Sequence, residues 1–171
     1  MGKVYILDAN VMIYLAEIGK INALFKSHII HLSPVVYEEI KFIEENESEF
    51  RISINLQEFI DSERLKILDS PNYDMVLNTK REILKSRRNL DDGELEAISF
   101  LLENRNFIFC TGDKAAIIIL AFLGLAEQGI SLERLMGKFK NMQNEYTEKY
   151  FRKYIIEGRT LKIQFNLDFK Q

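Results

Sequence analysis

The sequence predicts an α/β fold of three layers, with a mostly parallel central sheet between two layers of helices and a C-terminal appendage of one helix and one strand. Short apolar runs of strand character alternate along the chain with segments of helical spacing, as is typical of parallel sheets covered on both faces. The chain has 171 residues, of which 47% are hydrophobic, so it can bury one sizeable core.

The first half of the chain contains two strand-helix units and a third, weaker one. Each strand is a short apolar run, and the helix that follows has apolar residues at helical spacing. The first strand stops at Asp8, and the second helix has Ser33 as its cap and Pro34 at its first position. The expected strands cover residues 3–7, 28–32 and 65–68, the last at a sheet edge, and the expected helices cover residues 10–17, 35–43 and part of 50–63.

The second half of the chain continues the alternation of helix and strand. A turn at residues 70–72 precedes a helix with an apolar and a basic face, and the acidic residues 91–94 (DDGE) open the next helix. A strongly apolar run then ends at Asp113, where another helix begins. The expected helices cover residues 74–85, 95–103 and 114–123, and the expected strand covers residues 107–111.

The last 41 residues differ in charge from the rest of the chain. From Ser131 onward the net charge is +4, whereas residues 1–130 carry a net charge of −7. We therefore expect a domain over residues 1–130 and an extension over residues 131–171 docked on it. Residues 143–156 predict a helix, and the apolar residues after it alternate with polar ones as in a one-sided strand. These alternating residues are Leu161, Ile163, Phe165, Leu167 and Phe169.

Composition excludes several classes of protein. Cys110 is the only cysteine, which rules out an internal disulfide and a cysteine-rich zinc site. No amino-terminal targeting signal is apparent, and the longest apolar run, residues 115–123, is too short to span a membrane. We therefore expect a soluble, cytoplasmic protein without membrane contact.

Acidic residues are expected at the edge of the sheet where ligands collect in parallel α/β folds. Asp8 and Asp113 follow predicted strands and project onto that edge, and Glu39 and Glu94 come from neighbouring helices. Carboxylates brought together repel one another, and such a cluster persists mainly around a divalent cation. Oxygen ligands favour Mg²⁺ or Mn²⁺ over zinc. The predicted chemistry is metal-assisted attack of water on a phosphodiester.

Four short motifs, in a fixed order over residues 3–125, resemble those of PIN-domain proteins. The first is YILDANVMIYL at residues 5–15, and the second is SPVVYEEI at residues 33–40, in which the spacing from the serine selects Glu39 over Glu38. The third is LDDGELEAI at residues 90–98, and the last is FCTGD at residues 109–113. No single motif is specific, but their order and their placement on strand ends and helices strengthen the resemblance.

The resemblance implies a metal-dependent ribonuclease whose acidic quartet is Asp8, Glu39, Glu94 and Asp113, with Asn10 and Thr111 supporting the site and contacting substrate. Asp92 and Glu96 compete with Glu94 for the third acidic position, and Lys114 stands where many relatives carry another acid. Many small PIN proteins are toxins of toxin-antitoxin pairs. The resemblance therefore also implies an antitoxin partner protein and a homodimer.

A group of basic residues precedes the third motif and consists of Lys80, Arg81, Lys85, Arg87 and Arg88. It is either a solvated helix face or a surface beside the acids that holds the RNA backbone, with Lys80, Arg81, Arg87 and Arg88 as the candidate contacts. The whole chain has a net charge of −3, which lacks the basic signature of many nucleic-acid binders. Without the four acids of the quartet the remaining charge is +1, which is compatible with an RNA substrate.

Two alternative functions remain open at the level of sequence. The first is a binding or assembly protein that keeps the fold without catalysis, in which the acids serve only as helix caps. The second is a phosphatase or phosphotransferase with Asp8 as nucleophile. Such enzymes carry a second Asp two residues later, where this chain has Asn10.

Overall fold

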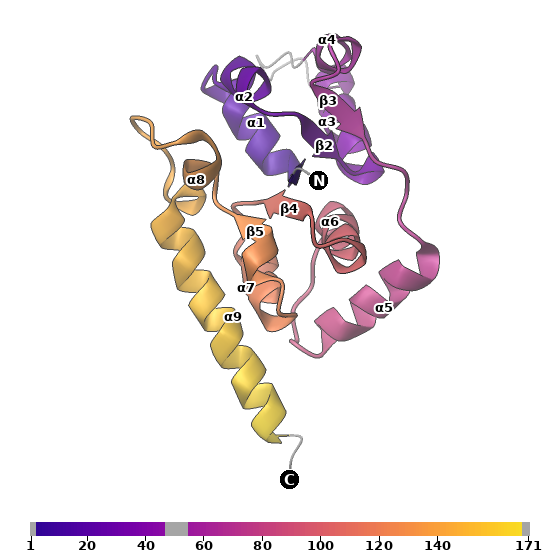
Figure 1. Ribbon diagram of the computed structural model, residues 1–171, viewed down its shortest axis with the longest axis vertical. Helices are drawn as coiled ribbons and strands as arrows, with labels where there is room; N and C mark the ends of the chain where they lie inside the picture. The colour runs from indigo at the N-terminus through magenta and orange to yellow at the C-terminus, as the bar shows by residue number, and fades with distance from the viewer. Residues whose placement is uncertain (1–2, 47–54, 169–171) are drawn as a thin grey trace.

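The centre of the molecule is a five-stranded sheet in which all strands are parallel (Figure 1). The computed structural model describes residues 3–46 and 55–168, without the side chains of residues 42–46. From one edge to the other, the strands of this part of the chain are β3 (Leu65–Ile67), β2 (Ile30–Leu32), β1 (Val4–Leu7), β4 (Phe107–Cys110) and β5 (Gly129–Ile130). The four predicted strands up to residue 111 are confirmed, including the edge position of β3.

Helices cover both faces of the sheet, which confirms the predicted three-layer fold. Side chains alternate in direction along a strand, so Leu7 and Cys110 pack in one core while Ile6 and Phe109 pack in the other. The first core is covered by α1 (Ala9–Glu17), α2 (Ile21–Ser27), α3 (Pro34–Asn46), α4 (Leu56–Asp61) and α8 (Leu132–Met136). The second core is covered by α5 (Tyr73–Leu84), α6 (Asp92–Glu103) and α7 (Lys114–Phe122).

The register of the two central strands fixes the position of the candidate site. Val4 of β1 pairs with Phe107 of β4, and Leu7 pairs with Cys110, so both strands end at the same level. The N–H of Asp8 donates to the carbonyl oxygen of Cys110 at 3.2 Å, which extends the ladder by one bond. The residues after the two strands therefore leave the sheet side by side.

A long C-terminal helix, α9 (Glu148–Asp168), packs along α7 (Figure 1). The two helices run in the same direction, since Lys114 lies over the Tyr154 ring and Phe122 contacts Phe165 farther along. Gly158 permits their close approach, because a Cβ there would lie 2.7 Å from the Cβ of Ala121 and would meet the backbone of Ile118.

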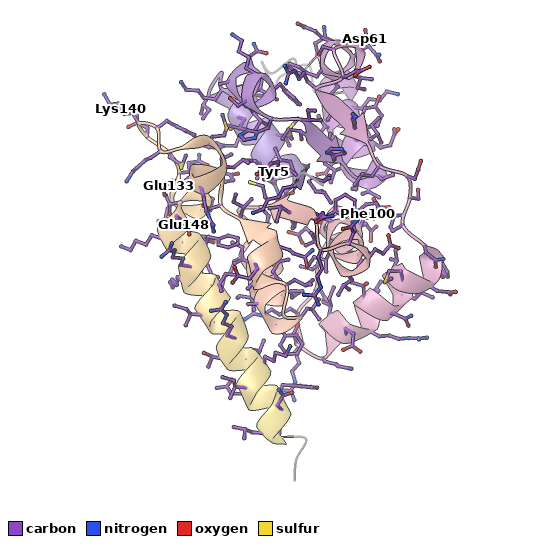
Figure 2. All side chains as sticks on the ribbon, viewed as in Figure 1. Tyr5, Asp61, Phe100, Glu133, Lys140 and Glu148 are labelled. Atoms are coloured by element: carbon purple, nitrogen blue, oxygen red, sulfur yellow. The ribbon has the colours of Figure 1, made fainter. Side chains whose placement is uncertain are left out.

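Side-chain hydrogen bonds fix the start of α9 on α8. The backbone N–H of Glu148 donates to the Glu133 carboxylate at 2.8 Å, and Ser131 donates its hydroxyl to Glu148 at 2.7 Å (Figure 2). A 3₁₀ turn, η2 (Asn144–Tyr146), precedes the helix. The helix predicted over residues 143–156 therefore begins later, at Glu148, and extends farther.

The predicted C-terminal strand is wrong, because residues 161–168 belong to α9. Of the five alternating apolar residues, Phe169 lies outside the described part of the chain. Within a helix, Leu161 and Phe165 are four residues apart and share a face; Leu161 joins the α7–α9 core and Phe165 contacts Phe122. Ile163 and Leu167 are 61% and 62% exposed on the other side. The alternation of apolar residues thus places half of them on a buried helix face and half in solvent.

Several short elements of the structure were predicted only in part or not at all. The helix predicted within residues 50–63 is α4, and residues 50–54 lie outside the described part. The two-residue strand β5, the helices α2 and α8 and the 3₁₀ turn η1 (Ala126–Gln128) were not predicted, because each is too short for a hydrophobic period. In the described part of the chain, every helix is too short or too polar to cross a membrane.

Candidate active site

Asp8 and Asp113, the two acids that follow β1 and β4, are joined through Thr111. The Thr111 hydroxyl donates to Asp8 Oδ2 at 2.9 Å, and the Asp113 N–H donates to Thr111 Oγ1 at 2.9 Å. Asp8 is 4% exposed and caps α1 by accepting from the Asn10 N–H at 3.3 Å. Asp113 caps α7 by accepting from the Ala116 N–H at 2.8 Å. Thr111 is therefore a positioning residue that orients the Asp8 carboxylate and anchors the backbone of Asp113.

The turn between Thr111 and Asp113 is held against the segment that leads into α9. A Cβ on Gly112 would lie 2.6 Å from the Tyr146 ring, so a larger residue would displace the ring or the turn. The Tyr146 hydroxyl also donates to the Asn10 carbonyl oxygen at 3.2 Å. Tyr146 thus ties the strand-end residues of β1 and β4 to the beginning of the C-terminal extension.

The amino terminus of α6 brings two more acids, Asp91 and Glu94, to the region of Asp8 and Asp113. Asp91 and Glu94 form a capping box, in which the Glu94 N–H donates to Asp91 Oδ1 at 2.8 Å and the Asp91 N–H donates to Glu94 Oε2 at 3.3 Å. Glu94 is only 6% exposed although it is a carboxylic acid. A cap alone does not require such burial, because most capping acids remain in water.

Close packing of α3 on α6 brings Glu39 toward the same region. A Cβ on Gly93 would lie 2.8 Å from a Val36 methyl group, so Val36 of α3 packs directly against the backbone of α6. Glu39 is exposed, and its pKa is raised by partial burial and then by the charge of Asp91. It therefore lies at the rim of the acidic cluster.

Mutual repulsion and burial raise the pKa of the two innermost acids. The pKa of Asp8 is raised to about 6, mainly by burial and also by the charges of Asp91 and Asp113, while the hydrogen bonds from Thr111 and Asn10 oppose the rise. The pKa of Glu94 is raised to about 9, mainly by burial and also by the charges of Asp113, Asp91 and Asp8. These couplings define one acidic cluster, which comprises Asp8, Glu39, Asp91, Glu94 and Asp113.

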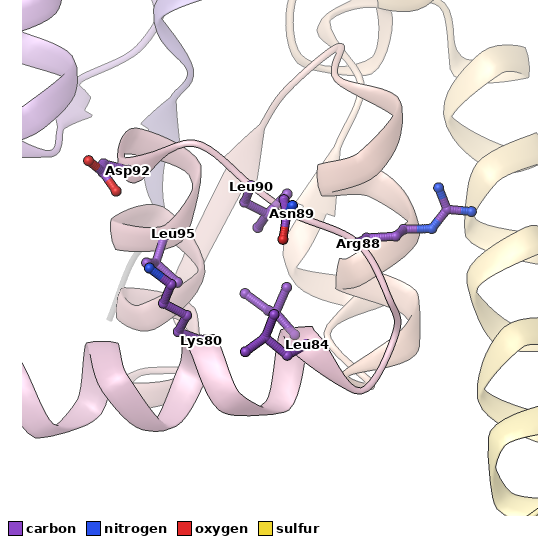
Figure 3. A pocket seen from close by; sticks show the side chains of 8 residues that line it. Lys80, Leu84, Arg88, Asn89, Leu90, Asp92 and Leu95 are labelled. Atoms are coloured by element: carbon purple, nitrogen blue, oxygen red, sulfur yellow. The ribbon is translucent and has the colours of Figure 1, made fainter.

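The structure separates the three competitors for the third acidic position. Glu94 lies with Asp8 and Asp113, whereas Glu96 accepts from the Val35 N–H at 3.2 Å and so caps α3. Asp92 lines a hollow of 290 Å³ between α5 and α6, where Lys80 lies opposite (Figure 3).

Asp91 is the member of the cluster that the sequence did not identify. Its position before a helix suggested a dipole-compensating cap, and the structure does place it as the cap of α6. Its charge nevertheless raises the pKa values of Asp8, Glu39 and Glu94. Only the packing of α3, α6 and β1 reveals that the charge of Asp91 acts on the neighbouring acids.

The basic group before α6 has partners other than the acidic cluster. Arg88 points toward α9 and pairs with Glu157 at 2.9 Å (Figure 3), and Arg81 donates to Asn78 at 3.3 Å. Arg87 has a positive φ of 57° and lines a hollow beside the C-terminal part of α9. In the described residues, no hydrogen bond or ion pair joins Lys80, Arg81, Arg87 or Arg88 to the acids of the cluster. RNA contact by this group stays a prediction.

The chemistry of the cluster fits a hard divalent cation. Its donors are carboxylate oxygens and the Thr111 hydroxyl, which are ligands that Mg²⁺ and Mn²⁺ prefer. Burial without a neutralising charge is what raises the pKa values of Asp8 and Glu94, and a cation would relieve that cost. Among the described residues, no three His, Cys, Asp or Glu side chains are already arranged as a metal-ligand set.

Comparison with known proteins identifies the fold family. A family model described as PIN domain matches residues 4–132, which span β1 to the start of α8 and contain the whole acidic cluster. A search of curated proteins and a search of solved structures each gave no match. The resemblance of the four motifs is thereby confirmed over three quarters of the sequence, and the chain belongs to the PIN-domain family.

Proposed function

We propose that this protein is a ribonuclease that hydrolyses RNA phosphodiesters with Mg²⁺ or Mn²⁺. The PIN domain is a nuclease-type fold, which supports a hydrolytic function. The observation that carries the proposal is the acidic cluster itself, in which Asp8 and Glu94 are buried carboxylic acids whose pKa values are raised by burial and by the charges of neighbouring acids. Such an arrangement is costly for stability, and a bound cation accounts for its cost.

Asp8, Glu94 and Asp113 are the proposed metal ligands, with Glu39 at the rim and Asp91 as a further acid. When bound, the ion would activate water and neutralise the charge that develops on the phosphate oxygens. Thr111 links the Asp8 carboxylate to the backbone of Asp113 through its two hydrogen bonds. Asn10 is exposed beside Asp8, so its side chain is available to a substrate.

The burial of Asp8 argues against the phosphatase alternative. Asp8 is only 4% exposed, and both of its carboxylate oxygens accept hydrogen bonds, so direct attack of this carboxylate on a phosphate is disfavoured. The non-catalytic alternative differs from the proposal in one respect: it requires no cation at the cluster. A role as a toxin, with an antitoxin partner and as a homodimer, is a further proposal that rests on the family alone.

Calorimetric titration with Mn²⁺ and Mg²⁺ tests the ligand set. Glu94→Gln removes a proposed ligand, and Asp92→Asn is the matched control, because Asp92 lies on the same helix turn but lines the hollow toward α5. We expect Glu94→Gln to weaken binding at least tenfold and Asp92→Asn to change it less than twofold. Equal effects of the two substitutions would contradict the assignment of Glu94.

A further inference from the structure

The start of α9 presents aromatic rings at the margin of the acidic cluster. Tyr150 lies in the first turn of α9, where its N–H donates to Thr147 Oγ1 at 3.3 Å. The Tyr150 ring contacts the Tyr154 ring edge to face, with centroids 4.6 Å apart. The Tyr154 ring in turn lies under Lys114 of α7, the residue directly after Asp113, so the two rings lie next to this end of the cluster. Tyr150 is half-buried, so part of its ring remains accessible.

Two lysines converge on the Tyr154 ring from different helices. Lys114 Nζ lies 4.9 Å from the ring centroid and Lys153 Nζ lies 5.0 Å from it, and both lysines are exposed. In the described part of the chain, neither lysine forms an ion pair with a carboxylate. The two exposed ammonium groups make this part of the surface positively charged, and such a surface attracts an anion.

The position of Lys114 adds a second electrostatic argument. Lys114 is the first residue of α7, directly after the cap Asp113, and a cation there opposes the helix dipole. A capping sequence selected for stability alone favours an acid or a neutral residue at this position. The placement of Lys114 is explained if its charge binds an anion next to Asp113.

We propose that Tyr150, Lys114 and Lys153 form a platform that holds single-stranded RNA next to the acidic cluster. The inference rests on the proposed function, since it names how the substrate of that site is held. A base would stack on Tyr150 and a backbone phosphate would lie near the two ammonium groups. The base faces of a duplex are already stacked, so a ring can take up only an unpaired base.

Fluorescence anisotropy with the Asp8→Asn protein of 171 residues measures binding without cleavage. The probes are a labelled single-stranded RNA of about 12 nucleotides and the same sequence annealed to its complement. We expect Tyr150→Ala to weaken single-strand binding about tenfold and Tyr150→Phe, which keeps the ring, to change it less than twofold. Loss of binding in both variants, or in neither, would overturn the stacking role.

The lysines are tested by the salt dependence of the same binding. Removing two phosphate contacts should reduce the slope of log K against log salt by about 1.4. We expect this for Lys114→Gln combined with Lys153→Gln, and a smaller change for Lys26→Gln combined with Lys66→Gln, on α2 and the edge strand β3. Equal slopes for the two double variants would overturn the phosphate contact.

The same variants separate this platform from the proposed function. If wild-type protein fails to cleave RNA but the Asp8→Asn protein binds single strands through Tyr150 and the lysines, the platform stands and the nuclease proposal fails. If wild-type protein cleaves and the Tyr150→Ala and lysine variants bind and cleave equally well, the platform alone fails. Preferred binding of the duplex would likewise overturn the platform. Thermal unfolding followed by circular dichroism confirms that each variant is folded.

Discussion

The Asp8→Asn substitution is expected to stabilise the metal-free protein while it abolishes metal-dependent cleavage. Asp8 lies at 4% exposure among other acids, and its pKa is raised from 3.8 to about 6 by burial, with further contributions from Asp91 and Asp113. At neutral pH the folded protein therefore carries an ionised carboxylate in an unfavourable environment. An amide of the same shape removes the charge and its cost.

The size of the effect follows from the pKa difference. A pKa raised from 3.8 to about 6 corresponds to about 3 kcal/mol of stability lost when Asp8 is ionised. The amide can replace only one of the two hydrogen bonds, from Asn10 and from Thr111, which costs about 1 kcal/mol. The expected net gain is about 2 kcal/mol, or about 4 to 8 °C in melting temperature for a chain of this length.

The gain must depend on pH in a definite direction. Below the unfolded pKa of 3.8, Asp8 is neutral in the folded and the unfolded state, so the wild type bears no charge penalty. The penalty grows as pH rises from about 4 to about 6 and is constant above that. The stability difference between Asp8→Asn and wild type should therefore appear in this window and persist at pH 7.5.

Urea unfolding followed by circular dichroism, in EDTA and at several pH values, measures this difference. A control in saturating Mg²⁺ should stabilise the wild type through binding and leave Asp8→Asn unchanged, which reverses or reduces the difference. An Asp8→Asn protein less stable than wild type at pH 7.5 in EDTA would refute the reasoning, as would a gain that does not vary with pH.

Two further predictions concern Thr111 at the site and Gly158 at the contact of α7 with α9. Thr111→Val should reduce metal-dependent cleavage and cost about 1 to 3 kcal/mol of stability, because it removes the hydroxyl that bridges Asp8 and Asp113. The control is Ser99→Ala, which removes a buried hydroxyl farther along α6. Equal losses of activity in the two variants would contradict a positioning role for Thr111. Gly158→Ala should lower the free energy of unfolding by about 1 to 3 kcal/mol, because the added Cβ would meet α7. A urea midpoint equal to that of the wild type would show that α9 does not pack on α7 as closely as described.

The sequence predicted the part of the site that lies at the carboxyl ends of the parallel strands β1 and β4. The apolar runs before Asp8 and Thr111 identify β1 and β4, and their register places those residues side by side. Thr111 was expected to support the site, and its hydroxyl is the bridge between the acids. This part was accessible because each strand is continuous and ends at a polar residue.

The remainder depended on packing that no local pattern contains. Asp91 joins the cluster only because α6 approaches α3 at Gly93. Arg88 meets Glu157 of α9, one residue beyond the predicted end of that helix. Residues 161–168 continue the helix, whereas their alternation suggested a strand. The close approach at Gly158 makes that helix more favourable, since it buries one face against α7.

Cleavage of a labelled single-stranded RNA, with Mn²⁺ titrated into wild-type and Asp8→Asn protein, tests the central claim most directly. The account predicts cleavage by the wild type that rises with Mn²⁺ and stops in EDTA, and none by the folded Asp8→Asn protein. Equal cleavage by both proteins, or none by the wild type at any Mn²⁺ concentration, would contradict the assignment of the acidic cluster as a metal-dependent ribonuclease site.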